Sequence, residues 1–225
     1  MNAKKLRAII ELGETDTVEF KRKFSGFEKI AKEMIALANT RGGLLLVGVD
    51  DDGRIVGVDS EKSEIDLLTS AAEFYCSPPI ETDVEVVEID GVDVIVIHIP
   101  ESRTKPHQLV PSPSEAAHRN GADAHNPNDT RVYIRQGEKS VMASREVVRV
   151  LAASQPDAPP LVLEIGNIER VLFDHLEKNE RITLREFRHL VNISERRASR
   201  SLVRLVRAGL IRIFTNESED YYTLA

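Results

Sequence analysis

Arginine side chains are concentrated near the C-terminal end of this sequence. The segment 181–212 contains nine arginines and only two acidic residues, Glu186 and Glu195, whereas the whole chain has a formal net charge of -7. A guanidinium group binds phosphate oxygens and the acceptor-rich edge of guanine, and a local surplus of one sign is typical of a surface that meets a polyanion. The composition of this segment therefore predicts contact with nucleic acid.

The order of these residues separates two kinds of expected contact. A helix in the major groove of DNA uses its first turns for base edges, while flanking basic residues hold phosphates. The residues expected to bind DNA are Arg196, Arg197, Ser199, Arg200, Arg204, Arg207 and Arg212. Among them, Arg196, Arg197 and Arg200 are placed to read bases. The last three arginines are better placed for the DNA backbone.

Three helices and two strands are expected to position these arginines. Apolar residues recur at helical spacing in 165–178, and Thr183 is a cap for a second helix over 184–190. A third helix over 194–207 buries Ala198, Leu202, Leu205 and Val206 and ends at Gly209. Residues 210–214 and 221–224 are expected to form two strands around an acidic turn. This order predicts a winged helix-turn-helix whose third helix reads the major groove.

The residues before position 155 alternate between helical and strand patterns. Helices are expected at 6–12, 27–39, 63–75 and 144–153, and strands at 17–22, 44–49, 54–58, 84–89, 92–99 and 131–135. Asp-Gly turns at 52–53 and 90–91 predict two hairpins, 44–58 and 84–99. Residues 100–130 lose all periodicity, which is typical of a functional flap or a disordered loop.

Three prolines at positions 156, 159 and 160 mark the boundary between two modules. We expect an α/β domain over 1–154, a proline-rich linker over 155–164 and the winged helix over 165–225. The charge is divided in the same way. Residues 161–225 carry 11 basic and 10 acidic side chains, and residues 1–160 carry 19 basic and 27 acidic side chains. The acidic character therefore belongs to the N-terminal module.

The bulk composition indicates a cytoplasmic protein. Cys76 is the single cysteine, which excludes an internal disulfide and a cysteine-based zinc cluster. No apolar run approaches the length that spans a bilayer, and the first residues show no signal peptide. No membrane partner is expected.

Five sequence blocks in the N-terminal module occur in a recognisable order. They are 14–21 (ETDTVEFK), 36–43 (ALANTRGG), 45–53 (LLVGVDDDG), 105–107 (KPH), and 133–137 (YIRQG) leading to Ala143-Ser144. This order resembles the Schlafen-type AlbA domain family over most of residues 11–150. The resemblance implies an α/β (α+β) fold. Bacterial and archaeal relatives commonly join this domain to a winged helix and are described as candidate DNA-binding proteins or transcriptional regulators.

The same resemblance carries an enzymatic alternative. The Schlafen proteins of animals look like metal-dependent ribonucleases with three carboxylates, which would fall on Glu14, Glu19 and Asp51 here. Such carboxylates can hold Mg²⁺ or Mn²⁺ and activate water, and Lys21 would bind a substrate phosphate. Acids at a strand start and in a turn are also ordinary surface residues. No metal or other cofactor is expected outside this alternative.

Two further sites have weak support. Gly42 and Gly43 follow a helix and precede a strand, the reverse of a phosphate-binding loop, and no P-loop lysine is present. His107, His118 and His125 share the loop 100–130, but their spacings of 11 and 7 match no compact zinc motif. Neither ATP nor zinc is therefore expected.

Three functions from different classes follow from these patterns. The protein is a double-stranded DNA-binding transcriptional regulator, a metal-dependent nuclease acting on RNA or single-stranded DNA, or an interaction scaffold. The single-signed arginine band favours the regulator, so enzymatic activity is not our first expectation. We expect a homodimer, because one short helix reads too few base pairs for useful specificity.

Overall fold

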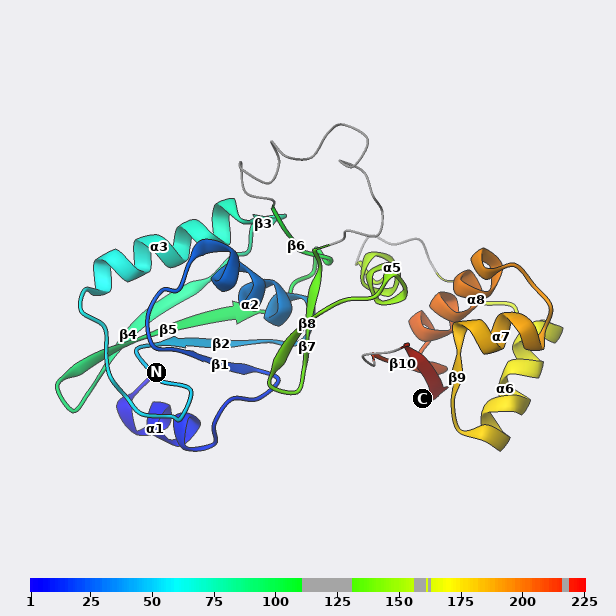
Figure 1. The fold of residues 1–225 in the computed structure, drawn as a ribbon, viewed down its shortest axis with the longest axis horizontal. Coiled ribbons are helices and arrows are strands. Elements are labelled where there is room, and N and C mark those ends of the chain that lie inside the picture. The colour runs from blue at the N-terminus through cyan, green and yellow to red at the C-terminus, as the bar shows by residue number, and fades with distance from the viewer. Residues whose placement is uncertain (111–130, 156–160, 162, 216–218) are drawn as a thin grey trace. The chain divides into compact units, whose positions relative to one another are not determined.

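The computed structural model describes residues 1–110, 131–155, 161, 163–215 and 219–225 (Figure 1). They divide into two compact units, Met1–Met142 and Ala143–Ala225. Most of the loop expected at 100–130, with His118 and His125, and most of the expected proline linker lie outside the described residues. Within the described part of the chain, no helix has the length and hydropathy to cross a membrane.

A four-stranded sheet forms the centre of unit 1. Its strands are β1 (Val18–Lys21), β2 (Gly42–Val47), β4 (Asp83–Ile89) and β5 (Val92–Pro100), in the order β1-β2-β5-β4. The β1–β2 pair is parallel and the other neighbours are antiparallel. A parallel pair needs a crossover connection, and helix α2 (Phe27–Asn39) supplies it.

Alternate residues of the central strands face two separate cores. On β2, Leu45 and Val47 belong to the core beneath α2 and α3 (Glu61–Phe74), whereas Leu46 belongs to the core beneath α1 (Ala3–Glu11). Figure 1 shows α2 and α3 on one side of the sheet and α1 on the other. A strand buried on both faces reads as a continuous apolar run, as β2 does. The expected mixed α/β fold of this module is confirmed.

The first expected hairpin is wrong beyond its turn. The turn itself forms, because Gly53 N donates to Asp50 O at 2.8 Å. Residues 54–58 form no strand, and a single bridge joins Val49 to Ile55. Both edges of β2 are already bonded, to β1 and to β5, so a return strand has no edge to join. The second hairpin is confirmed by β4 and β5.

Two short strand pairs complete unit 1. β3 (Cys76–Ser77) pairs with β6 (Gln108–Leu109), and β7 (Tyr133–Gln136) pairs with β8 (Lys139–Met142). The β7–β8 hairpin contacts α2. It therefore brings residues near position 135 to the same region as the start of β1, which is more than a hundred residues earlier in the sequence.

Unit 2 consists of helices and a small sheet. The helices are α5 (Arg145–Ala153), α6 (Asn167–Asn179), α7 (Leu184–Leu190) and α8 (Glu195–Arg207). The strands β9 (Ile182–Thr183), β10 (Ile211–Phe214) and β11 (Tyr221–Leu224) form an antiparallel sheet in the order β10-β11-β9. Leu172, Phe187, Leu202 and Tyr222 fill the core between them.

Helix α5 lies in unit 2, although the sequence pattern grouped it with the N-terminal module. It begins at Ser144, whose hydroxyl accepts from Val147 N at 3.2 Å, and it contacts α8. Ser144 Oγ also donates to the carboxylate of Asp220. The division between the units therefore falls at residues 142 and 143, before the helix rather than after it.

Candidate nucleic-acid interface and carboxylate network

The arginines of α8 share one face of the helix. At about 100° per residue, all five fall within an arc of about 100°. They are Arg196, Arg197, Arg200, Arg204 and Arg207. The opposite side of the helix carries Ala198, Leu202 and Leu205, which are completely or almost completely buried. Hydrophobic packing on one side therefore fixes which side the arginines present.

These arginines differ in how free their side chains are. Arg196, Arg197 and Arg200 are exposed and make no side-chain hydrogen bond or ion pair with any residue that the structure describes. Arg204 and Arg207 are half-buried and have partners. Arg212 lies on β10 and is exposed. The group expected to read bases is thus the most available for a ligand.

Ser199 does not project from this face as we expected. Its side chain is 2% exposed, and its hydroxyl accepts a hydrogen bond from Arg149 Nη1 of α5. The position lies beside the buried stripe of α8, where α5 covers it. Ser199 therefore joins α8 to α5, and we leave it out of the DNA-binding face.

Local interactions hold the start of α8 and the helices next to it. Ser194 Oγ accepts from Arg197 N at 3.4 Å, and Glu195 pairs with Arg188 of α7 at 3.1 Å. A groove between α8 and the start of α6 is lined by Arg197, Arg200 and Arg204. Glu164 and Glu169 line the same groove, so its charge is mixed.

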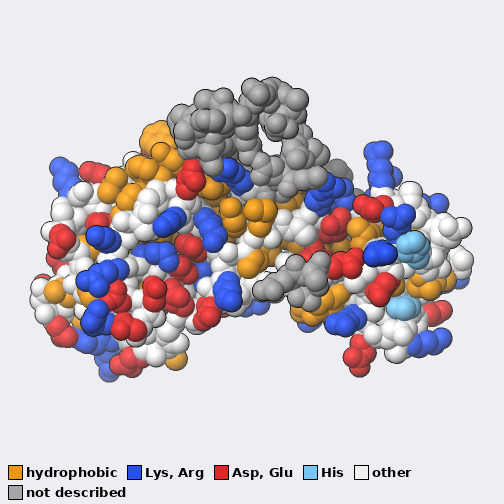
Figure 2. Space-filling model, in the orientation of Figure 1, with side chains coloured by type: hydrophobic (Ala, Val, Ile, Leu, Met, Phe, Trp, Pro, Cys, Tyr) orange, Lys and Arg blue, Asp and Glu red, His pale blue; other side chains and the backbone are white. Residues whose placement is uncertain are grey.

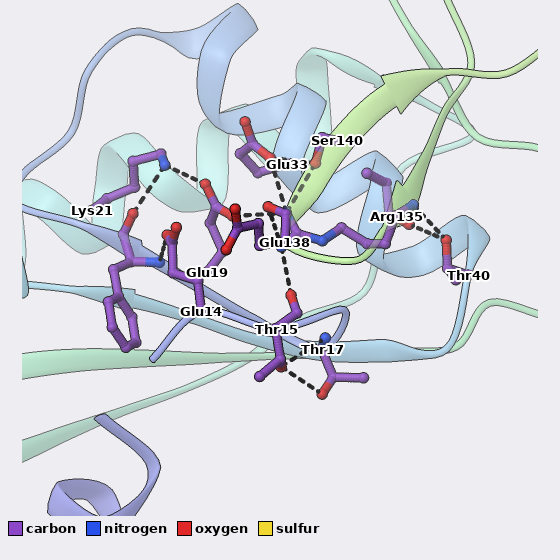
Figure 3. A network of polar contacts seen from close by, with 12 residues as sticks. Glu14, Thr15, Thr17, Glu19, Lys21, Glu33, Thr40, Arg135, Glu138 and Ser140 are labelled. Carbon is purple, nitrogen blue, oxygen red and sulfur yellow. Dashed lines mark hydrogen bonds and ion pairs between the residues drawn. The ribbon is translucent and has the colours of Figure 1, made fainter. Parts of the chain in front are cut away.

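Glu14 and Glu19, two of the three carboxylates suggested by the resemblance, lie in a network of polar contacts at β1 (Figure 3). Glu19 is 6% exposed. One of its oxygens accepts from Lys21 Nζ, and the other accepts from Arg135 Nη1 at 2.7 Å. Glu14 Oε1 accepts from the backbone N–H of Phe20 at 2.8 Å. Protein groups therefore already satisfy both oxygens of Glu19.

Arg135 is the centre of this network and was not among our expected site residues. Its side chain is completely buried, and its Nη2 donates to Thr15 O at 2.6 Å and to Glu138 O at 2.9 Å. Its Nη1 also donates to Ser140 Oγ at 3.1 Å. The arginine of the YIRQG block was the signal in the sequence, because the resemblance places this block in the same domain as Glu19.

The electrostatics of Glu14 show how the three acids are arranged. Burial raises the pKa of Glu14, the Phe20 N–H opposes this, and repulsion from Glu19 and Asp51 adds to the raised pKa. Asp51 itself is exposed in the turn after β2. Glu19 and Asp51 are thus both within electrostatic range of Glu14.

This arrangement does not fit a divalent metal ion. Lys21 and Arg135 occupy the carboxylate of Glu19, and among the described residues no group of three or more acids, histidines or cysteines is arranged to hold a metal. Carboxylates that hold Mg²⁺ or Mn²⁺ need oxygens that are not already bound to protein cations. No catalytic step through a metal follows from this geometry.

Unit 1 is a mixed sheet with helices on both faces and an arginine-centred carboxylate network beside its parallel edge. The sequence comparison gives its family: the chain belongs to the Schlafen AlbA_2 family, whose model matches residues 14–144. The expected AlbA-type domain is therefore confirmed. The comparison with curated proteins gave no match.

Two solved structures are similar to this chain. One is the N-terminal domain of a protein from Nitrosomonas europaea named as related to the ATP-dependent DNA helicase RecG, with 24% identity and a TM-score of 0.43, covering 50% of this chain and 82% of that one. The other is the DIP2311 protein from Corynebacterium diphtheriae, with 21% identity and a TM-score of 0.44, covering 65% of this chain and 25% of that one.

Proposed function

We propose that unit 2 is a winged helix-turn-helix that binds double-stranded DNA and that the protein regulates transcription. The order α6, β9, α7, α8, β10, β11 supports this, because it supplies three helices followed by a two-stranded wing, with β9 completing the sheet. In such a domain α8 is the helix that enters the major groove. A DNA-binding regulator of this kind acts where the chromosome is, which agrees with the cytoplasmic location expected from the sequence.

The arginine face of α8 is the observation that carries this proposal. Arg196, Arg197 and Arg200 are exposed, unpaired within the described residues and fixed to one side of a helix whose other side is core. The major groove is about 12 Å wide and accommodates one α-helix, and arginine is the most frequent reader of guanine. Base reading is assigned to these three arginines, and phosphate contacts to Arg204, Arg207 and Arg212.

A salt-titrated mobility shift of the intact protein on a mixed pool of double-stranded DNA tests the proposal. Binding is expected to weaken steeply with salt. Arg200→Ala should reduce affinity about tenfold or more, since a good bidentate base contact is worth about 1–3 kcal/mol. Arg103→Ala is the matched control, because it removes one exposed arginine from unit 1. Equal effects of the two variants would mean that α8 is not the DNA-binding face.

A homodimer is part of the proposal, since two copies of α8 would read two half-sites one helical turn or more apart. Sedimentation velocity of the free protein and of its DNA complex tests this. We do not propose the nuclease alternative, because protein cations occupy the carboxylate of Glu19.

A further inference from the structure

A column of stacked side chains crosses the small sheet of unit 2. The Arg181 guanidinium lies over the Tyr221 ring, 5.6 Å from its centroid. The rings of Tyr221 and Phe214 are stacked with centroids 5.3 Å apart and planes 10° apart. The Arg181 guanidinium, the Tyr221 ring and the Phe214 ring therefore form three layers of one stack.

The strand order determines the direction of this column. Phe214 on β10 is paired with Tyr221 on β11, and Tyr221 is paired with Thr183 on β9. Arg181 precedes β9, so it approaches Tyr221 from the side opposite to Phe214. Because β10 is an edge strand of this sheet, the column ends at Phe214.

The end of the column is open. Phe214 is 42% exposed, although one face of its ring lies against Tyr221. Among the described residues, no ring other than that of Tyr221 and no cation is stacked on Phe214. An exposed aromatic ring that is held by a second ring has little conformational freedom left to lose on binding. It is therefore a suitable platform for one more planar group.

The surrounding charges indicate which planar group this is. Arg212 lies two residues before Phe214 and therefore on the same face of β10, and it is exposed. A nucleic acid strand offers a planar base to Phe214 and a phosphate to Arg212. Glu219, two residues before Tyr221, is exposed and would repel a phosphate near the ring, so a base rather than the backbone is expected at Phe214.

We propose that Phe214 stacks an unpaired base of a DNA strand that extends beyond the duplex held by α8. This inference rests on the proposed function, and it adds a second element to the recognised DNA: a junction between double and single strand. The bases of an intact duplex are stacked on their own neighbours and cannot present a free face to Phe214. A blunt duplex would therefore use α8 alone.

The test compares the affinity of the full chain for a blunt duplex with its affinity for the same duplex carrying a short 3′ or 5′ single-stranded extension. An extension of the correct polarity is expected to strengthen binding about tenfold, within the range measured for stacking of one base. Phe214→Leu should abolish this gain and leave binding to the blunt duplex unchanged, because leucine keeps the apolar volume but has no ring. Phe74→Leu is the matched control, since Phe74 is an exposed phenylalanine of unit 1.

A spectroscopic signal makes the contact itself visible. 2-Aminopurine in the extension should lose fluorescence when it stacks on Phe214, and the chain contains no tryptophan that would interfere. The signal should persist in Phe74→Leu and disappear in Phe214→Leu. A blunt duplex that binds as tightly as an extended one, or a gain that survives in Phe214→Leu, would overturn the inference while the proposed function stands. Failure to bind any duplex would instead remove the proposed function.

Discussion

At the scale of single residues, Arg135 connects segments of the AlbA-type domain that are far apart in the sequence. Its buried guanidinium joins Glu19 of β1, the backbone at Thr15 and Ser140 of β8. These groups come from distant parts of the sequence, so the arginine fixes the position of the hairpin β7–β8 against the start of β1. The same contacts place a positive charge where the enzymatic alternative would place a metal ion.

Glu19→Gln is expected to destabilise unit 1 by up to about 3 kcal/mol. It removes the nearer carboxylate of the buried Arg135 guanidinium and leaves Glu33, at 3.4 Å, as the remaining ion-pair partner. Urea unfolding of the full chain, followed by NMR signals from unit 1, measures the loss. Glu73→Gln is the control, since Glu73 is exposed on α3. A loss of stability as small as that of the control would show that the Glu19–Arg135 pair contributes little.

Glu14→Gln, in contrast to Glu19→Gln, is not expected to destabilise unit 1 at pH 7. The pKa of Glu14 is raised mainly by burial, so folding favours its neutral form. The contribution of this group to stability is greatest below its unfolded pKa, near 4.5, and is lost as the pH rises through the folded pKa. Glutamine keeps an oxygen for Phe20 N–H without the charge.

At pH 7 this variant should therefore be at least as stable as the natural sequence, and its advantage should decrease toward pH 4. Thermal unfolding of both proteins across this pH range measures the difference. An advantage that grows on acidification would contradict the assigned direction of the pKa shift.

Site residues that could be predicted from the sequence belong to local sequence patterns, whereas those that could not are positioned by distant elements. Glu14 and Glu19 stand in a recognisable block, whereas Arg135, the partner of Glu19, could be connected to them only through the resemblance. Ser199 lies at the margin of the buried stripe of α8 formed by Ala198, Leu202, Leu205 and Val206, about 70° from its centre. Whether such a position is exposed depends on a neighbouring helix, here α5, and no pattern within α8 encodes that neighbour.

At the scale of elements, helix boundaries followed from local chemistry. Helix α2 has the predicted bounds 27–39, and α7 has the predicted bounds 184–190 with the predicted cap at Thr183. A cap is a contact between residues three positions apart, so it can be read directly from the sequence. The two-residue strands β3, β6 and β9 were missed, because their pairing partners are remote and two residues show no periodicity.

Thr183→Ala is expected to cost unit 2 about 1 kcal/mol by removing the cap of α7. The hydroxyl of Thr183 accepts from Glu186 N at 3.2 Å, and the Glu186 carboxylate accepts from Thr183 N at 2.8 Å. Urea unfolding followed by NMR signals from unit 2 measures the cost. An unchanged midpoint would mean that packing alone maintains α7.

Glu186 adds a pH dependence to the same helix start. The hydrogen bond from the Thr183 backbone lowers the pKa of Glu186, so its stabilising contribution is present above the unfolded pKa of about 4.5 and is lost as the pH falls through the folded value. Glu186→Gln should lower the stability of unit 2 at pH 7 and change it little in acid, so the stability of the variant should depend less on pH. Equal acid sensitivity of the two proteins would assign the effect to other carboxylates.

At the scale of the whole molecule, the chain combines an acidic module with a basic surface. The net charge of -7 repels DNA at long range, so binding depends on the local surplus on α8. This division was visible in the sequence, because charge composition needs no knowledge of the fold. The unit boundary at residues 142 and 143 was less visible, since helix α5 follows the AlbA-type domain without a break in pattern.

The salt dependence of DNA binding is expected to report the number of α8 helices engaged. The three arginines assigned to phosphates, Arg204, Arg207 and Arg212, predict a slope of about -3 in a plot of log affinity against log salt, and a dimer doubles this value. Arg212→Ala should reduce the magnitude by about 1 for a monomer and about 2 for a dimer, while Arg103→Ala should leave it unchanged. A slope near zero would exclude phosphate contacts as the source of affinity.

Strand β11 has a consequence for how unit 2 resists mechanical extension. It contains some of the last residues of the sequence, yet it is the middle strand of its sheet, with β10 and β9 bonded to its two edges and Tyr222 completely buried. A force that extends the chain at β11 must break both ladders at once. Deleting part of β11 would separate β9 from β10, so we expect such a deletion to disrupt the whole small sheet.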